Sequence, residues 1–264
     1  MESLNDKKDK KVILKIEDVS KWFGTVQALD NVNLEIYEKE IVGLVGDNGA
    51  GKSTLIKIIS GNFPPDKGNI FIEGHKVNFK SPVEARKMGI ETVYQDLSLC
   101  ENLDSAANLF IGRELCRKFV GMDFLQKKKM EEKTQEVMKK IDINIPSFKE
   151  RVQFLSGGQR QAVSLGRFVA WGQKLVLLDE PTAALGVKET RKVLNLISNV
   201  RNDVPFSMIL ISHNLQQVFE VADRIVVLRH GNVITIKEKA LTNPDEIVSY
   251  ITGAIFVGAE KNNP

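Results

Sequence analysis

Short apolar segments alternate with helical patterns along most of the chain. Residues 32–36 read Val-Asn-Leu-Glu-Ile, and this strict alternation of apolar and polar side chains predicts a strand with one buried face. A continuous apolar run such as Leu175–Leu178 instead predicts a strand buried on both faces. By these criteria, strands are expected at 12–19, 32–36, 40–45, 70–73, 76–79, 90–94, 175–178, 208–211, 224–228 and 233–236.

Helical spacing occupies the longer segments between these strands. Ser156 stands where an N-cap is expected, directly before a helical pattern that continues to Val169. From about residue 97 to residue 154 the strand pattern stops, so we expect a purely helical insertion into a domain whose strands resume afterwards. Helices are expected at 55–59, 82–88, 106–111, 125–141, 157–169, 189–200 and 245–251.

Composition limits the class of protein. The 264 residues are 42% apolar, enough for one large α/β domain or two small ones. The net charge of +3 leaves 37 basic residues nearly balanced by 34 acidic ones, which does not indicate nucleic acid as a partner. Cys100 and Cys116 have no second pair, so we interpret both as reduced thiols in cytosol. No signal-peptide pattern and no apolar run of the ~20 residues that cross a bilayer are visible, which predicts a soluble or peripheral protein.

The charge is uneven in one stretch. Residues 113–140 carry nine Lys or Arg against five Asp or Glu. A solvated helix face is the ordinary explanation for such a stretch, and a docking face for a partner is the alternative.

A glycine-rich loop separates the strand predicted at 40–45 from the helix predicted at 55–59. Its sequence fits the pattern G-x-x-x-x-G-K-S/T. Glycines let backbone N–H groups turn toward a phosphate, and the helix start adds unpaired donors and a positive dipole end. Lys52 supplies a cation for the β- and γ-phosphates, and the Ser53 hydroxyl is a candidate Mg²⁺ ligand. The predicted phosphate-binding residues are Gly46, Asp47, Asn48, Gly49, Ala50, Gly51, Lys52, Ser53 and Thr54.

A second helix start also carries glycines. Residues 155–159 read Leu-Ser-Gly-Gly-Gln, so exposed N–H donors make this segment a second potential phosphate site. Its candidate residues are Ser156, Gly157, Gly158 and Gln159.

Polar residues follow several predicted strands. Gln95 follows the strand at 90–94, Asp179 and Glu180 follow the strand at 175–178, and His213 follows the strand at 208–211. Upstream of the glycine-rich loop, Phe23 could stack on a base. The residues alone favour a core aromatic at the end of a strand.

Together, the phosphate loop, Gln95, residues 155–159, the Leu-Leu-Asp-Glu-Pro of 177–181 and His213 resemble the nucleotide-binding subunit of an ATP-binding cassette (ABC) transporter. The resemblance covers roughly Val12 to Gly253. It implies a P-loop NTPase core with a RecA-like, mostly parallel sheet, an N-terminal antiparallel β subdomain and a helical insertion. The implied boundaries are one domain over 1–264, with the core at 12–96 and 155–240, the helical subdomain at 97–154, and tails at 1–11 and 254–264.

The resemblance also implies individual roles around ATP and Mg²⁺. Phe23 would stack on adenine, and the loop at 46–54 would hold the phosphates. Ser53 and Gln95 would ligate Mg²⁺, with Asp179 holding the ion through water.

Two further residues would carry hydrolysis. Glu180 would polarise the attacking water as a general base, a role worth typically ~10²–10⁴-fold in rate. His213 would contact the γ-phosphate and orient the water. Residues 156–159 would complete the ATP site of a second copy in a head-to-tail homodimer that hydrolysis releases.

Three segments, 107–114, 179–190 and 250–253, resemble single-cassette monosaccharide importers of the ribose, xylose and fructose type. This implies an ATPase at the cytoplasmic face of the cell membrane. It would energise a separate permease that docks near Gln95 and the helical insertion and is fed by an extracellular or periplasmic sugar-binding protein. Nucleic acid is not among the implied partners. An exporter ATPase and a soluble cassette protein acting on ribosomes or DNA are the alternatives.

One residue departs from the family pattern. After Asp-Glu-Pro-Thr-Ala-Ala-Leu the chain has Gly186, where the family usually has an aspartate that crosses the dimer interface. This leaves open how the two ATP sites are coupled, and it raises the alternative of a nucleotide-binding module with little turnover. Glu180 and His213 are both present, so hydrolysis is still expected.

Overall fold

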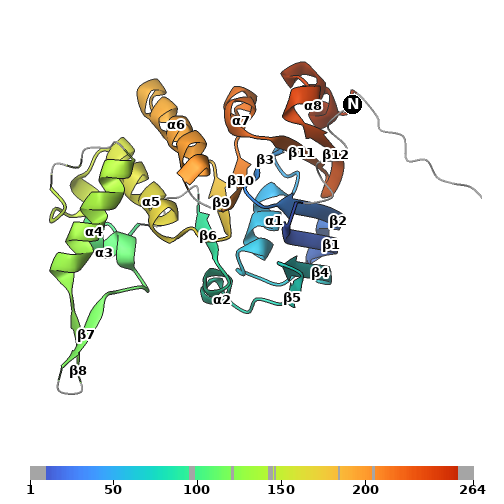
Figure 1. Cartoon of the computed structure of the whole chain (residues 1–264). Coiled ribbons are helices and arrows are strands. Elements are labelled where there is room, and N and C mark those ends of the chain that lie inside the picture. Colours follow the sequence, from blue (N-terminus) through green and yellow to red (C-terminus); the bar gives the residue numbers. More distant parts are fainter. Residues whose placement is uncertain are drawn as a thin grey trace, which may run out of the picture.

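A six-stranded sheet forms the centre of the molecule (Figure 1). The computed structural model describes residues 10–94, 99–119, 122–141, 145, 147–183, 185–203 and 206–254. The strand order is β12-β11-β3-β10-β9-β6, and every neighbouring pair is parallel except β11 with β12. The expected α/β class with a mostly parallel sheet is thus confirmed. The strands are β3 Ile41–Val45, β6 Ile90–Val93, β9 Leu175–Asp179, β10 Ser207–Ile211, β11 Arg224–Arg229 and β12 Asn232–Glu238.

The central strands contribute to two hydrophobic cores, one on each face of the sheet. In β3, Ile41 and Val45 belong to one core, whereas Val42 and Leu44 belong to the other. Helices α5 to α8 cover the first face, and α1 with the N-terminal strands covers the second. Burial on both faces explains why these strands read as continuous apolar runs. The helices are α1 Lys52–Ile59, α5 Gly157–Trp171, α6 Val187–Asp203, α7 Leu215–Val221 and α8 Pro244–Thr252.

The N-terminal strands form a separate antiparallel sheet, as the family resemblance implied. Its order is β2-β1-β4-β5, and the short helix α2 (Pro82–Lys87) follows. The first hairpin is longer than predicted, because β1 and β2 pair up to Phe23 and Val26 on either side of a tight turn at Gly24. Close to the turn the residues are exposed, and the buried positions just before it are the polar Ser20 and Lys21, so the apolar alternation that sequence patterns detect is missing. The strands are β1 Val12–Phe23, β2 Val26–Tyr37, β4 Lys67–Ile72 and β5 His75–Val77.

The insertion contains helices and also one hairpin. Helix α3 (Ser105–Phe110) and helix α4 (Lys127–Lys140) pack against α5, as predicted for a helical subdomain. The prediction that strands stop between 97 and 154 is wrong, because β7 (Cys116–Phe119) and β8 (Met122–Leu125) pair there. All eight residues of these strands are exposed, so no face carries the burial pattern by which strands were recognised.

Helix α7 was not predicted at all. It spans Leu215–Val221 and buries only Val218 and Val221, so its sequence shows little apolar spacing. Asn214 caps it by accepting a hydrogen bond from the Gln217 N–H. It packs against β3, where a Cβ on Gly43 would lie 2.3 Å from Cγ1 of Val218. Within the described residues, no helix combines the length and apolar character needed to span a bilayer.

Candidate functional site

The glycine-rich loop joins β3 to α1 and is pressed against neighbouring strands. Gly46 has φ +155°, and a Cβ there would lie 2.1 Å from the carbonyl oxygen of Leu228. Gly51 has φ +105°, and its Cβ would lie 2.7 Å from the Ala28 carbonyl oxygen. A side chain at either position is excluded by backbone atoms, so this path of the loop requires glycine. Gly51 is also the N-cap of α1 and offers no side chain to cap the helix.

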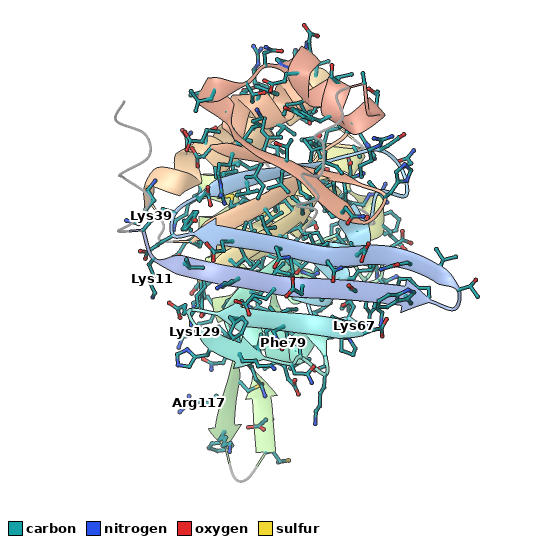
Figure 2. The ribbon with its side chains drawn as sticks, turned by 90° about the vertical axis from the view of Figure 1, so that its right-hand side faces the viewer. Lys11, Lys39, Lys67, Phe79, Arg117 and Lys129 are labelled. Atoms are coloured by element: carbon teal, nitrogen blue, oxygen red, sulfur yellow. The ribbon has the colours of Figure 1, made fainter. Side chains whose placement is uncertain are left out.

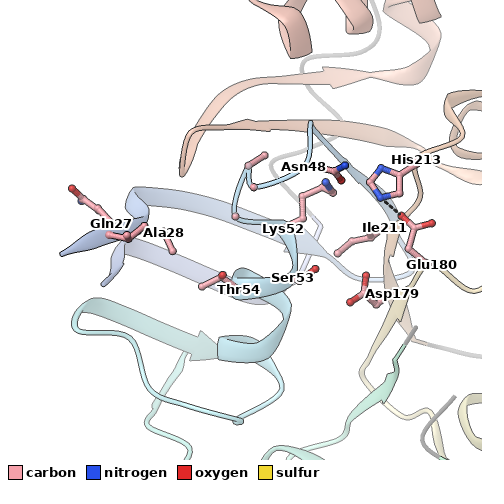
Figure 3. A pocket seen from close by; sticks show the side chains of 14 residues that line it. Gln27, Ala28, Asn48, Lys52, Ser53, Thr54, Asp179, Glu180, Ile211 and His213 are labelled. Carbon is pink, nitrogen blue, oxygen red and sulfur yellow. Dashed lines mark ion pairs between the residues drawn. The ribbon is translucent and has the colours of Figure 1, made fainter. Parts of the chain in front are cut away.

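A cavity of about 470 Å³ opens beside this loop (Figure 3). Its size lies in the usual range for small-molecule sites. The sequence predicted the contributions of the loop, Asp179, Glu180 and His213. It did not predict Ile211 or the β2 residues that form one wall. The lining residues are Val26, Gln27, Ala28, Asn48, Gly49, Ala50, Gly51, Lys52, Ser53, Thr54, Asp179, Glu180, Ile211 and His213.

Lys52 lines the cavity and is buried. Its ammonium group donates to the carbonyl oxygens of Gly46 at 2.9 Å and Asp47 at 3.0 Å. Burial lowers the pKa of Lys52, and the nearby carboxylates of Glu180 and Asp179 partly oppose that effect. A buried cation surrounded by glycine backbone is suited to a bound polyanion such as a triphosphate.

Glu180 and His213 lie side by side in the lining of the cavity (Figure 3). Glu180 Oε1 lies 3.1 Å from His213 Nε2 and is buried, yet among the described atoms it accepts no hydrogen bond of good geometry. Burial raises the pKa of Glu180, while the His213 side chain lowers it. A buried carboxylate oxygen with unused acceptor capacity is suited to hold and deprotonate a water molecule.

Glu180 is aimed into the cavity by an unusual backbone conformation. Its φ is +53°, in the left-handed region that costs a non-glycine residue roughly 1–2 kcal/mol. The turn is held because the Glu180 N–H donates to the Ile211 carbonyl oxygen at 3.1 Å. The next residue is held as well, since Gln161 of α5 donates to the Pro181 carbonyl oxygen at 2.6 Å. Strain of this kind at a strand end is typical of functional sites.

The expected Mg²⁺ ligands are only partly described. Ser53 and Asp179 both line the cavity, and their hydroxyl and carboxylate oxygens are donors that Mg²⁺ prefers. The third predicted ligand, Gln95, lies outside the described residues. No three His, Cys, Asp or Glu side chains gather into a metal cage in the part of the chain that the structure describes. Mg²⁺ bound by one or two side chains together with substrate phosphates needs no such cage.

Phe23 lies outside the lining of the cavity, at the end of β1 next to Val26, which does line it. Its side chain is 48% exposed, so the alternative of a buried core aromatic is wrong. The ring packs edge-on against Phe63 with centroids 5.4 Å apart. Phe23 therefore presents an accessible aromatic surface at the rim of the cavity.

Among the described residues that line this cavity, none comes from the segment 155–159. Ser156 caps α5 as predicted: its side chain accepts from the Gln159 N–H at 3.2 Å, and the Gln159 side chain accepts from the Ser156 N–H at 2.9 Å. This reciprocal capping box fixes the start of the helix. Gly157 has no atom within 4 Å of its Cβ position, so the surface beside it is open.

A carboxylate does lie beside Gly186, although the usual aspartate is absent. Glu189, in the first turn of α6, places its Oε2 atom 2.9 Å from the Cβ position of Gly186. Its Cγ atom lies 3.2 Å from the Cβ position of Gly158. Glu189 thus lies beside both Gly158, in the first turn of α5, and Gly186, directly before α6.

Comparison with known proteins agrees with this geometry. The chain is 50% identical to the xylose/arabinose import ATP-binding protein of Sulfolobus acidocaldarius over 240 residues, covering 91% of this chain and 94% of that protein. It is 44% identical to the fructose import ATP-binding protein of Rhizobium meliloti, covering 92% and 94% of the two chains. With the ribose import ATP-binding protein of Caldanaerobacter subterraneus the identity is 37%, and the match covers 48% of that longer protein.

Solved structures give the same result. A dimeric ATP-binding cassette bound to ADP and phosphate in a post-hydrolysis state matches with a TM-score of 0.73 and 26% identity, covering 86% of this chain and 99% of that one. A dimeric bacterial ABC transporter cassette matches with a TM-score of 0.75 and 25% identity over the same shares. The family model for ABC transporters matches residues 29–183, which contain the glycine-rich loop, the α5 start and Glu180. The chain therefore belongs to the ABC transporter family, as one of its ATP-binding subunits.

Proposed function

We propose that this chain hydrolyses ATP to energise a separate membrane permease that imports a monosaccharide. The observation that carries the proposal is the single cavity shared by Lys52, Ser53, Glu180 and His213. The import ATP-binding proteins of xylose/arabinose, fructose and ribose transport support sugar import over export or a role on ribosomes or DNA. Which sugar is carried depends on the permease and on its external binding protein.

The residues of the cavity divide into binding and proton-transfer roles. The loop at 46–54 binds the phosphates through its backbone, and Lys52 neutralises part of their charge. Ser53, Asp179 and Gln95 would hold Mg²⁺, which supplies electrostatic stabilisation of the charge that develops on the phosphates. Phe23, at the rim, is accessible for stacking on adenine.

Glu180 is the general base in this proposal. Its Oε1 has acceptor capacity to spare, and its raised pKa brings it closer to the range in which general bases are effective. The imidazole of His213, 3.1 Å away, is placed to orient the same water and to contact the γ-phosphate.

Ser156–Gln159 would act in a second copy. The segment lies outside the cavity and carries an open glycine surface at a helix start, which suits a phosphate approached from another molecule. The dimeric cassettes that match this chain support a dimer. We place the homodimer at the cytoplasmic face of the membrane, with the permease docked near Gln95 and the helical insertion.

Glu180→Gln tests the catalytic part of the proposal. Since glutamine cannot accept the proton, ATP hydrolysis should fall by about 10²–10⁴-fold while ATP still binds. The uncleaved nucleotide should then hold two copies together, which size-exclusion chromatography with ATP and Mg²⁺ would detect. Lys52→Ala is the matched control, because it should abolish ATP binding and leave a monomer. Wild-type turnover in Glu180→Gln, or monomers only, would contradict the assignment.

Recovery of the chain from native membranes tests the transport part. A gentle pull-down should bring a multi-spanning permease together with a sugar-binding protein, whose ligand names the substrate. Recovery only from the soluble fraction, with ribosomes or DNA, would remove the transporter assignment and leave the ATPase chemistry intact.

A further inference from the structure

The β7–β8 hairpin projects from the helical subdomain away from the rest of the molecule (Figures 1 and 2). Its base is anchored, since the Gln126 N–H donates to the Leu115 carbonyl oxygen at 2.7 Å and Leu115 packs against the cluster formed by α3 and α4. Beyond this base, every described residue of both strands is exposed. A two-stranded hairpin with both faces in water is marginally stable by itself.

The strand register separates two unlike faces. Arg117 lies opposite Phe124, and Phe119 lies opposite Met122, so these four side chains share one face. The rings of Phe119 and Phe124 pack edge-on with centroids 6.4 Å apart. We call Arg117, Phe119, Met122 and Phe124 the aromatic face.

The aromatic face leaves a large apolar surface in water. Phe119 is 62% exposed, Met122 is 59% exposed and Phe124 is 49% exposed. Contiguous exposed apolar side chains on a projecting element indicate an interaction surface. No described residue from elsewhere in the chain forms a ring contact with these two phenylalanines.

Positive charge lies next to this face at the base of the hairpin. Lys118 is on the opposite face, across from Asp123, whereas Lys127, Lys128 and Lys129 begin α4 directly after β8. These three lysines are exposed, and none forms an ion pair with a residue in the described part of the chain. The first turn of α4 contains no acidic residue to balance them.

Three lysines in the first turn of a helix oppose the helix dipole, which favours negative charge there. Helix α4 is fourteen residues long, so its dipole is not weakened by a short length and the unfavourable interaction with the lysines remains. A sequence that breaks a local rule without a compensating contact points to function rather than to folding. An external anionic surface would supply the missing negative charge.

We propose that the hairpin binds the surface of a bilayer that contains anionic phospholipid. The aromatic face would enter the boundary between headgroups and acyl chains, while Arg117 and Lys127–Lys129 contact the phosphates. Aromatic side chains flanked by several cations are the pattern of interfacial membrane anchors. Lipid binding by the hairpin would add to the membrane attachment that a permease provides. This proposal does not depend on the proposed transport function.

Sedimentation of the purified full-length chain with lipid vesicles tests this proposal. Wild type should sediment with vesicles of phosphatidylcholine and phosphatidylglycerol in equal parts, and not with phosphatidylcholine alone. The variant F119S/F124S should lose at least about tenfold in affinity through lost apolar burial. The variant K127Q/K128Q/K129Q should lose about 100-fold, because each cation near an anionic surface contributes about fivefold.

Two control variants remove the same kinds of side chain from surfaces outside the hairpin. L241S/V248S removes two exposed apolar side chains, and K39Q/K57Q/K76Q removes three exposed lysines. Both should sediment like wild type. The hairpin variants should keep wild-type ATPase activity, and their unfolding temperatures should not fall below that of wild type, which separates a lost membrane contact from a misfolded or inactive protein.

Three results would overturn the proposal. Wild type that does not bind the anionic vesicles would exclude a lipid contact. Hairpin variants that bind the vesicles undiminished would place the contact elsewhere. Hairpin variants that keep vesicle binding but no longer recover the permease would identify the hairpin as a protein-docking element.

Discussion

Gly46 and Gly49 lie in the same loop under different constraints. A Cβ on Gly46 would overlap the Leu228 carbonyl oxygen, whereas a Cβ on Gly49 would meet no atom within 4 Å, although φ there is +76°. We expect Gly46→Ala to lower the free energy of unfolding by more than ~2 kcal/mol and to abolish ATP binding. Gly49→Ala should cost only ~1 kcal/mol. Urea denaturation checks both, and equal costs would show that steric overlap is not what selects glycine at 46.

The pH dependence of turnover should report Glu180. Its pKa is raised by burial, and the base must be ionised, so the rate should rise with pH through a value above that of an ordinary glutamate. The His213 side chain lowers this pKa. His213→Gln should therefore move the acid limb of kcat/KM to higher pH, besides lowering its height. His230→Gln, in an exposed turn, should leave the limb in place. A limb that moves to lower pH in His213→Gln would refute the electrostatic coupling.

At the scale of elements, the start of α5 is fixed by its cap and not by burial. Ser156→Ala removes one half of the reciprocal capping box and should cost ~1 kcal/mol in unfolding free energy. The double variant Ser156→Ala/Gln159→Ala should cost less than the sum of the single variants, because the two residues act as one unit.

A matched helix cap separates stability from nucleotide chemistry. Asn243 caps α8 by accepting from the Glu246 N–H at 2.9 Å, far along the chain from the cavity residues. Asn243→Ala should cost a similar ~1 kcal/mol in thermal unfolding without changing ATP-dependent dimerisation. If both cap variants affect the dimer equally, the role of Ser156 there is only structural.

The length of the β1–β2 hairpin explains one wall of the cavity. β1 and β2 pair over twelve residues each, which carries Val26, Gln27 and Ala28 beside the glycine-rich loop. The Ala28 carbonyl oxygen is one of the atoms that excludes a side chain at Gly51. The hairpin of the antiparallel sheet thus lines the proposed nucleotide site as well as covering the core.

At the scale of the whole molecule, a buried ion pair joins the core sheet to the helical subdomain. Glu91 of β6 is 5% exposed, and its Oε2 lies 2.7 Å from Nη2 of Arg113, which follows α3. The Arg113 guanidinium lies 5.1 Å from the ring centroid of Trp171 in α5. Burial raises the pKa of Glu91, and the Arg113 guanidinium opposes this by favouring the charged carboxylate.

This pair predicts a coupling that a double-mutant cycle can measure. Glu91→Ala and Arg113→Ala should each destabilise the protein by about 2 kcal/mol, since each leaves the other charge without its partner. The double variant should lose less than the sum. The exposed pair of Lys15 and Glu17, 2.7 Å apart, is the control and should show far weaker coupling, because solvent screens it. Strictly additive losses for Glu91 and Arg113 would show that the pair does not couple the two parts.

Local rules determined much of this protein from sequence. The continuous runs of β3, β9 and β10, the glycine-rich loop and the Ser156 cap each depend on residues that are neighbours in the chain. Their physical causes, which are burial on two faces, freedom of φ and an N-terminal hydrogen bond, therefore appear in the sequence itself. The residues that the sequence placed in the site were recognisable because phosphate chemistry constrains their type and spacing.

Contacts between distant segments were decided only by the tertiary structure. The β2 wall of the cavity, the Glu189 carboxylate beside Gly186 and the Glu91–Arg113 pair depend on register and packing, which no local pattern encodes. The β7–β8 hairpin escaped detection for the opposite reason, because exposed strands carry no burial periodicity. Sequence thus determined what each segment can form, and packing between segments decided which side chains meet.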